Sequence, residues 1–359
     1  MNWEKVPKSL YTNLGSSGLK ISRIIVGCMS FGKTQWADWV VEDEEKVFAI
    51  MKAAYDAGIR TFDTADMYSN GYSEVLLGKF LKKYNIKRST VVIMTKCFVP
   101  VEEDDYDFTM LTMTDYPGHE YVNRSGLSRK HILDAVDKSV ENLGTYIDLY
   151  QIHRFDKTTP IEETMSALNA TIQSGKVRYI GASTMRTYQF VMMQNCAEKY
   201  GYAKFISMQA YYSLLYREEE EEMIAYCNAT GVGLIPWSPN AGGALTRPFK
   251  DLKTTDRGKS TLGFLGLAEL GEHEKEIVNR VEELSKKYGV SMASISVAWV
   301  ISKGNSPIIG FTKPERINDA LDGVNVKLSQ EDIGYLEEPY LPKPLPQLYT
   351  LSDWMCSVE

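Results

Sequence analysis

The sequence predicts an α/β fold, a single closed (β/α)8 TIM barrel with an N-terminal β-hairpin that caps the barrel bottom. Strand-like and helix-like segments alternate from about residue 21 to 322, as repeated βαβ units do. The strand-like segments are short and apolar without polar alternation, which indicates that both faces of the sheet are covered. Eight such units suit a closed barrel, and an open doubly wound sheet is the alternative.

A hairpin is expected before the barrel, because Gly15 and Gly18 enclose a two-serine turn between strand-like pieces within residues 11–22. The barrel strands that follow are apolar runs rich in β-branched residues. They are expected at 21–27, 60–65, 90–96, 147–153, 177–183, 205–209, 232–238 and 307–310.

Helices are expected between these strands, where apolar residues recur every three or four positions. In one of them Ser128 precedes the first turn and Gly144 follows the last, and these residue types start and end helices. The expected helices are 43–57, 72–84, 128–143, 161–174, 185–200, 218–230, two stretches within 273–303, and 314–322.

We expect residues 1–359 to form one barrel domain, with the barrel at about 21–322 and a C-terminal helix and proline-rich tail at 329–359. Two connections, 97–127 and 238–272, are longer than compact folds normally use, and both follow strand ends. Such loops are typically lids or binding elements, and a solvated loop without a role is the alternative.

The composition narrows the class of partner. The chain carries 40 basic and 47 acidic residues and has no basic stripe, so we expect no nucleic acid partner. Its five scattered cysteines include no Cys-x-x-Cys pair, which argues against a disulfide framework and against a zinc cluster. No signal peptide or membrane-length apolar run is present, so a cytoplasmic protein is expected.

Titratable groups stand where three successive strand-like runs end. Asp63 ends the RTFD portion of the second run, at 60–63, Lys96 ends the third run and His153 the fourth, and Tyr68 follows Asp63 by five positions. In a parallel barrel these ends share one rim, which is where the catalytic groups of such barrels collect.

The chemistry of the four groups is complementary. A tyrosine has a pKa of about 10 in water, so proton transfer near neutrality requires a nearby positive charge. Lys96 supplies that charge if Asp63 pairs with it, because an unpaired buried ammonium loses its proton. With His153 donating to a carbonyl oxygen, the set suits proton transfer to that oxygen while hydride reaches the carbon, and no metal is needed.

Each residue also has an ordinary structural explanation. Asp63 alone could cap a turn, Lys96 could extend its amine to solvent, and His153 could be a core histidine. Their joint occurrence, in order and at one predicted rim, favours the catalytic interpretation.

The chain resembles the aldo-keto reductases from the hairpin at 11–19 to a segment ending near 338. Asp63 and Tyr68 lie in FDTADMY, Lys96 in MTK and His153 in YQIHRFD. VGCMSFG, WADWVVED, VRYIGAS, LIPWSPNAGGALTR and YLEEPY are similar, more narrowly, to fungal proteins named as aryl-alcohol dehydrogenases. The resemblance implies an NADPH-dependent reductase of aldehydes or ketones, aryl aldehydes included. It further implies that Tyr68 is the acid, that Lys96 and Asp63 tune it, and that His153 orients the carbonyl.

The cofactor half of the resemblance falls on 307–320, where a strand ends and a helix is expected to begin at Pro314. A helix start offers backbone N–H groups to an anion, and Lys313 and Arg316 flank it. On its own the segment would be an ordinary helix start with exposed basic residues. By resemblance it holds the 2′-phosphate and adenine of NADP(H), through Gly310, Thr312, Lys313, Arg316 and Asp319.

The remaining cofactor positions are also implied by resemblance. Ser183 and Gln209 would bind the nicotinamide carboxamide, and Tyr212 would stack on the ring. Asp63 is also expected to be a cofactor-binding residue. The pyrophosphate loop would contain Trp237, Ser238, Pro239, Gly242 and Arg247.

Three positions depart from the family pattern and bear on cofactor affinity. Asn240 replaces a leucine, and Ala320 replaces an asparagine near the adenine. The pyrophosphate lysine is absent, and Arg247 stands one place earlier as its candidate substitute.

Two other functions remain open. One is a cofactor-sensing regulatory subunit, similar to the potassium-channel β subunits that share this fold and these four residues. The other is a hydrolase or isomerase whose rim residues only imitate the reductase set.

Overall fold

Eight parallel strands form the centre of the protein. The structure is a computed structural model, and it describes residues 8–109, 112–116, 118–254, 267 and 270–345. Each strand pairs with its sequence neighbour from β3 to β9, and β10 pairs with β3. The strands are β3 (Ile25–Gly27), β4 (Thr61–Asp63), β5 (Val92–Cys97), β6 (Ile147–Ile152), β7 (Val177–Ser183), β8 (Phe205–Gln209), β9 (Gly233–Leu234) and β10 (Ile308–Gly310).

The segment after β9 closes the sheet against β10. The Ile308 amide donates to the Pro236 carbonyl at 2.8 Å, and Trp237 forms a parallel bridge with Ile308. Because the first and last strands are joined in this way, the sheet is a barrel. The (β/α)8 prediction is confirmed, and the open doubly wound alternative is wrong.

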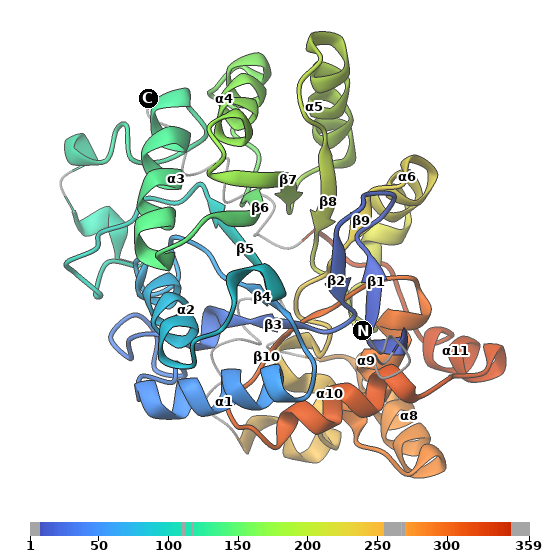
Figure 1. The fold of residues 1–359 in the computed structure, drawn as a ribbon. Coiled ribbons are helices and arrows are strands. Elements are labelled where there is room, and N and C mark those ends of the chain that lie inside the picture. The colour runs from blue at the N-terminus through green and yellow to red at the C-terminus, as the bar shows by residue number, and fades with distance from the viewer. Residues whose placement is uncertain (1–7, 110–111, 117, 255–266, 268–269, 346–359) are drawn as a thin grey trace.

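Helices surround the strands as the alternation predicted (Figure 1). Ser128 accepts a bond from the His131 amide at the start of α3, and Gly144 ends that helix in the left-handed conformation. The helices are α1 (Glu44–Asp56), α2 (Tyr72–Lys83), α3 (Arg129–Leu143), α4 (Ile161–Gln173), α5 (Thr187–Tyr200), α6 (Met223–Thr230), α8 (Glu272–Tyr288), α9 (Met292–Ser302), α10 (Arg316–Asn325) and α11 (Gln330–Glu337).

Two expected helices differ in detail. The stretch 218–230 divides into a 3-10 turn, η7 (Glu218–Glu220), and α6. The last barrel helix begins at Arg316, not at Pro314, because Arg316 and Ile317 donate to residues three positions earlier and form a tighter first turn.

The N-terminal hairpin lies against the amino ends of the strands. Its strands β1 (Tyr11–Asn13) and β2 (Lys20–Ser22) are antiparallel. The Ser16 amide donates to the Gly231 carbonyl at 2.7 Å, just before β9. Gly15 has a φ of +57°, and a side chain there would lie 2.3 Å from the same carbonyl oxygen. The hairpin therefore closes the barrel bottom, as predicted.

Inward-facing side chains change character along the barrel axis. Near the bottom an apolar cluster that includes Ile25, Met94 and Leu149 fills the interior. Lys96 and Gln151, each two residues further along its strand, share that inward face and are fully buried. The apolar layer thus supports a polar layer at the carboxyl ends of the strands.

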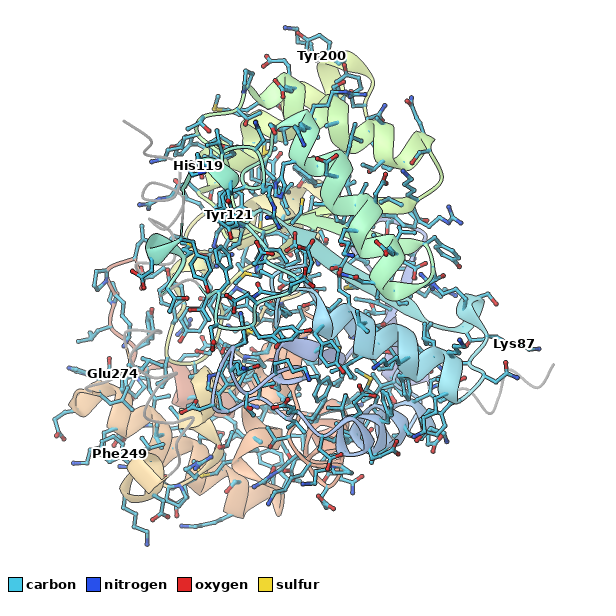
Figure 2. The ribbon with its side chains drawn as sticks, turned by 90° about the vertical axis from the view of Figure 1, so that its left-hand side faces the viewer. Lys87, His119, Tyr121, Tyr200, Phe249 and Glu274 are labelled. Carbon is cyan, nitrogen blue, oxygen red and sulfur yellow. The ribbon has the colours of Figure 1, made fainter. Side chains whose placement is uncertain are left out.

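Both long loops lie on the carboxyl-end side. Figure 2 shows Tyr121, from the loop after β5, and Phe249, from the loop after β9, on the side opposite Lys87, which precedes β5. The first loop has a core of its own, in which Phe108 stacks on Tyr121 at 4.9 Å between ring centroids. Much of the second loop and of the proline-rich tail lies outside the described residues.

Within the described ranges, no helix is long and apolar enough to cross a membrane.

Candidate active site

Asp63 and Lys96 form an ion pair inside the barrel. The Lys96 ammonium donates to Asp63 Oδ2 at 2.6 Å and to the Thr64 carbonyl at 2.8 Å, and its side chain is fully buried. Burial works against the charge, but Asp63 and then the Tyr68 oxygen outweigh it and raise the pKa of Lys96. A cation is thereby held at the rim.

Tyr68 stands beside this cation on the turn after β4. Its hydroxyl lies 3.4 Å from Lys96 Nζ, and its side chain is 9% exposed. Its ring packs against Trp36 and, edge to face, against His153, with centroids 6.3 and 6.0 Å away. Burial raises the pKa of Tyr68 above its ordinary value, and Lys96 opposes that rise. The phenol is therefore protonated at neutral pH and close to a charge that stabilises its phenolate.

His153 is held neutral. Burial, with the positive charges of Arg154 and Lys96, lowers the pKa of His153 well below its usual range. Its Nδ1 is buried and has no hydrogen-bond partner in the described residues. A neutral imidazole beside the Tyr68 ring can donate one hydrogen bond without adding charge to the site.

The structure adds a residue that sequence reasoning missed. Gln151 Nε2 donates to Asp63 Oδ1 at 3.1 Å, and Gln209 Nε2 donates to the same oxygen at 3.0 Å. The two glutamines also bond each other, from Gln209 Nε2 to Gln151 Oε1 at 3.0 Å. The available signal was strand parity, because Gln151 precedes His153 by two positions and shares its face.

Of the residues expected to contact the nicotinamide, Ser183 and Gln209 lie at this rim and Tyr212 does not. Ser183 is buried at the end of β7 and donates to the Gln209 carbonyl at 2.8 Å. Tyr212 is 1% exposed, its ring stacks on Trp299 at 5.0 Å, and its hydroxyl bonds Glu220. That position conflicts with stacking on a cofactor, because the ring packs against Trp299 of α9, one of the helices outside the barrel.

Trp237 is an aromatic residue that reaches the rim close to Ser183. It is half-buried, and its indole N–H donates to Thr184 Oγ1 at 3.3 Å, one residue beyond Ser183. Its other neighbour is Tyr211, which stacks on it at 4.7 Å. Trp237, one of the expected loop residues, is thus better placed than Tyr212 for a ring-stacking role.

The loop after Trp237 turns back sharply. Ser238 has a φ of 57° and Gly242 a φ of 64°, and the Ala241 amide donates to the Ser238 carbonyl at 2.9 Å. Pro239 is buried within this turn, and Arg247 is half-buried at the end of η8 (Ala241–Thr246). The loop therefore brings backbone amides and a guanidinium to the same end of the barrel.

The segment after β10 presents two cations to solvent. Lys313 and Arg316 are exposed, and the Arg316 side chain, 64% exposed, pairs with Asp319 at 3.1 Å. Gly310 ends β10 beside Gly27, and Thr312 follows it as another exposed residue. The donor set, two exposed cations beside the turn that precedes α10, fits a phosphate monoester.

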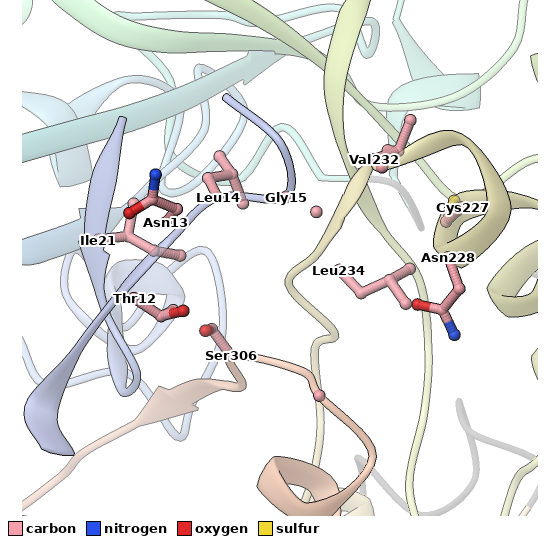
Figure 3. A pocket seen from close by; sticks show the side chains of 13 residues that line it. Thr12, Asn13, Leu14, Gly15, Ile21, Cys227, Asn228, Val232, Leu234 and Ser306 are labelled. Carbon is pink, nitrogen blue, oxygen red and sulfur yellow. The ribbon is translucent and has the colours of Figure 1, made fainter. Parts of the chain in front are cut away.

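A cavity of about 260 Å³ lies at the opposite end, between the hairpin and the start of β9 (Figure 3). Neutral polar groups such as Thr12, Asn228 and Ser306 line it. Its one titratable group is Cys227, whose pKa burial raises to about 12. Since it offers no acid-base pair, we place the chemistry at the rim. In the described part of the chain, no three His, Cys, Asp or Glu residues are grouped to hold a metal.

Comparison with known proteins shows the family of this chain. The model of the Aldo/keto reductase family matches residues 23–340. Proteins of Schizosaccharomyces pombe and Saccharomyces cerevisiae, both named "putative aryl-alcohol dehydrogenase", are 59% and 53% identical over 94% and 92% of this chain and 97% and 96% of their own lengths. The versiconal hemiacetal acetate reductase of Aspergillus parasiticus is 52% identical over 93% of this chain and 98% of its own. The chain belongs to the aldo/keto reductase family and is an oxidoreductase.

Proposed function

We propose that this enzyme is an NADPH-dependent reductase of aldehydes or ketones, aryl aldehydes included, with Tyr68 as the proton donor. One observation carries the proposal: the Tyr68 hydroxyl lies 3.4 Å from a buried ammonium that Asp63 holds in place. That arrangement stabilises the phenolate left after proton donation, which is what a tyrosine acid requires.

The protonated form of Tyr68 is the form that reduction uses. Because burial raises the pKa of Tyr68, its phenol keeps its proton at neutral pH and is ready to protonate a developing alkoxide. Alcohol oxidation would need the phenolate, which is the minor form under those conditions. His153 is neutral and can donate to the carbonyl oxygen that approaches Tyr68.

The coenzyme would lie along the rim, from the residues expected to hold its nicotinamide to those expected to hold its 2′-phosphate. Ser183, Gln209 and Trp237 would hold the nicotinamide, and Lys313 with Arg316 would hold the 2′-phosphate. When bound, the reduced nicotinamide supplies the hydride.

An aryl substrate is favoured by the aromatic surroundings of Tyr68. Trp36 packs on the Tyr68 ring, and Trp39 meets Trp36 edge to face at 6.0 Å. Flat aromatic walls suit a flat aromatic substrate. The names of two relatives point to aryl alcohols.

A direct assay tests the proposal. Purified enzyme, NADPH and a panel of benzaldehydes should give a steady loss of reduced-nicotinamide absorbance. Tight NADPH binding without turnover of any aldehyde or ketone would instead favour the regulatory-subunit alternative. No NADPH binding would favour an unrelated barrel chemistry.

The pH dependence of reduction should contain no titration of His153. Because its pKa lies well below 6.5, its ordinary value, the imidazole is neutral both above that pH and in the range just below it. We therefore expect kcat/KM to stay flat from about pH 8 to about pH 6, since the raised pKa of Tyr68 places its titration above the ordinary value of about 10. A fall in kcat/KM centred near 6.5 would contradict this assignment.

Arg316→Ala should weaken NADPH binding roughly tenfold and leave NADH binding nearly unchanged, because only NADPH carries the 2′-phosphate. Fluorescence titration with both coenzymes measures the effect. Arg129→Ala is the matched control, because Arg129 is likewise an exposed arginine at the first position of its helix. Equal losses for NADPH and NADH would remove Arg316 from the phosphate site.

A further inference from the structure

We propose that Gln151 is a positioning residue that fixes the orientation of the Gln209 amide, so that Gln209 presents a hydrogen-bond acceptor to the carboxamide of the coenzyme. This inference rests on the proposed function and deepens it. No feature of the sequence motifs assigned a role to Gln151, which is fully buried in β6.

The Asp63 carboxylate determines which way both amides point. A carboxylate only accepts hydrogen bonds, so the groups facing Asp63 Oδ1 must be the Nε2 atoms of Gln151 and Gln209. Oδ2 is taken by Lys96. Asp63 is thus surrounded by three donors, and neither amide can turn its oxygen toward it without repulsion.

Gln151 then completes a closed ring of bonds. With its nitrogen on Asp63, its Oε1 is the acceptor for the second hydrogen of Gln209 Nε2, at 3.0 Å. Both hydrogens of the Gln209 amide are engaged inside the barrel. Toward the rim this amide can therefore offer only its oxygen, which pairs with an N–H donor and not with a carbonyl.

The backbone around Gln151 leaves space for this arrangement. Gln151 stands in register between Lys96 on β5 and Gly181 on β7. A side chain at position 181 would lie 3.2 Å from Gln151 Cγ and 2.3 Å from Ser207 Oγ. The glycine thus allows a long amide to lie flat across the interior and reach both Asp63 and Gln209.

The test compares binding of NADP⁺ with binding of its 3-acetylpyridine analogue, in which a methyl ketone replaces the carboxamide and removes the N–H donor. We expect wild-type enzyme to prefer NADP⁺ roughly tenfold by calorimetric titration. In Gln151→Leu the Gln209 amide keeps only its bond to Asp63. NADP⁺ binding should weaken several-fold, and the preference should fall to roughly twofold.

A matched control separates this role from general packing. Gln194 is a buried glutamine of α5 that makes two hydrogen bonds, both to the backbone of Phe205 and away from the rim. Gln194→Leu should lower thermal stability while leaving the NADP⁺ preference at the wild-type value. A Gln151→Leu enzyme with the wild-type preference would overturn the inference, as would a wild-type enzyme that binds both ligands equally.

A second variant keeps the test informative if Gln151→Leu does not fold. In Gln151→Glu the new carboxyl lies beside Asp63, and repulsion between like charges favours its protonated form. That form still donates to Asp63 and accepts from Gln209. We expect the wild-type preference at pH 6 and a smaller one at higher pH, and a preference already lost at pH 6 would count against the proposal. Absence of any NADP⁺ binding by wild type would overturn the proposed function as well, which separates the two failures.

Discussion

Replacing Tyr68 by phenylalanine should lower kcat for aldehyde reduction roughly 10²- to 10⁴-fold, the usual contribution of a positioned general acid. The reason is local, because the change removes the hydroxyl that lies 3.4 Å from Lys96 and keeps the ring that packs on Trp36 and His153. NADPH binding and thermal stability should change little. Steady-state kinetics with benzaldehyde, a coenzyme titration and thermal unfolding measure these three effects.

Tyr72→Phe provides the matched control for this experiment. Tyr72 lies four residues later, on α2, and its hydroxyl bonds Glu44 on α1 at the outside of the barrel. The variant loses one phenolic hydroxyl whose partners are Glu44 and Lys79 and not Lys96, so it should retain wild-type kcat. Substantial turnover by Tyr68→Phe would identify a different proton donor.

Lys96→Met should destabilise the fold by about 3–5 kcal/mol, in addition to abolishing reduction. The substitution keeps an unbranched apolar side chain that is shorter by one heavy atom, and it leaves the Asp63 carboxylate buried without its cation. Urea unfolding, followed by circular dichroism, measures the change in the free energy of unfolding. The double variant Asp63→Asn/Lys96→Met should regain most of that stability, because it buries no charge, yet it should remain inactive.

The control for burial is an exposed pair of the same type. Lys79 pairs with Glu44 at 2.6 Å, and the two side chains are 47% and 35% exposed. Lys79→Met should therefore cost only about 0–1 kcal/mol. If Lys96→Met proved as mild as Lys79→Met, the Asp63–Lys96 pair would not be the buried charge pair that the proposed mechanism needs.

The barrel and the gathering of titratable residues at one rim could be predicted because their signals are local. Each strand is indicated by an apolar run, and each helix is indicated by the spacing of its apolar residues and by the residues at its ends. Asp63, Lys96 and His153 share a rim because strand ends of a parallel barrel meet there, whatever the details of packing. The Asp63–Lys96 pair and the proximity of Tyr68 follow from that topology, and the structure contains both contacts.

The structure differs from the expectations where local signals do not reach. Tyr212 and Trp237 are both aromatic residues close to strand ends, and only the path of the chain after β8 and β9 decides which one reaches the rim. Helix α10 begins at Arg316 and not at the expected Pro314, because the preceding turn is wound more tightly than an α-helix. Neither outcome can be obtained from residue preferences.

By itself, then, the sequence determined the fold class and predicted which four titratable residues stand at one rim, since periodicity and strand order are properties of consecutive residues. Only the tertiary structure decided that Gln151 and Gln209 meet on one oxygen of Asp63. The two glutamines are 58 positions apart in the chain. Their meeting depends on the register and closure of the barrel, which bring inward-facing side chains of separate strands to one level.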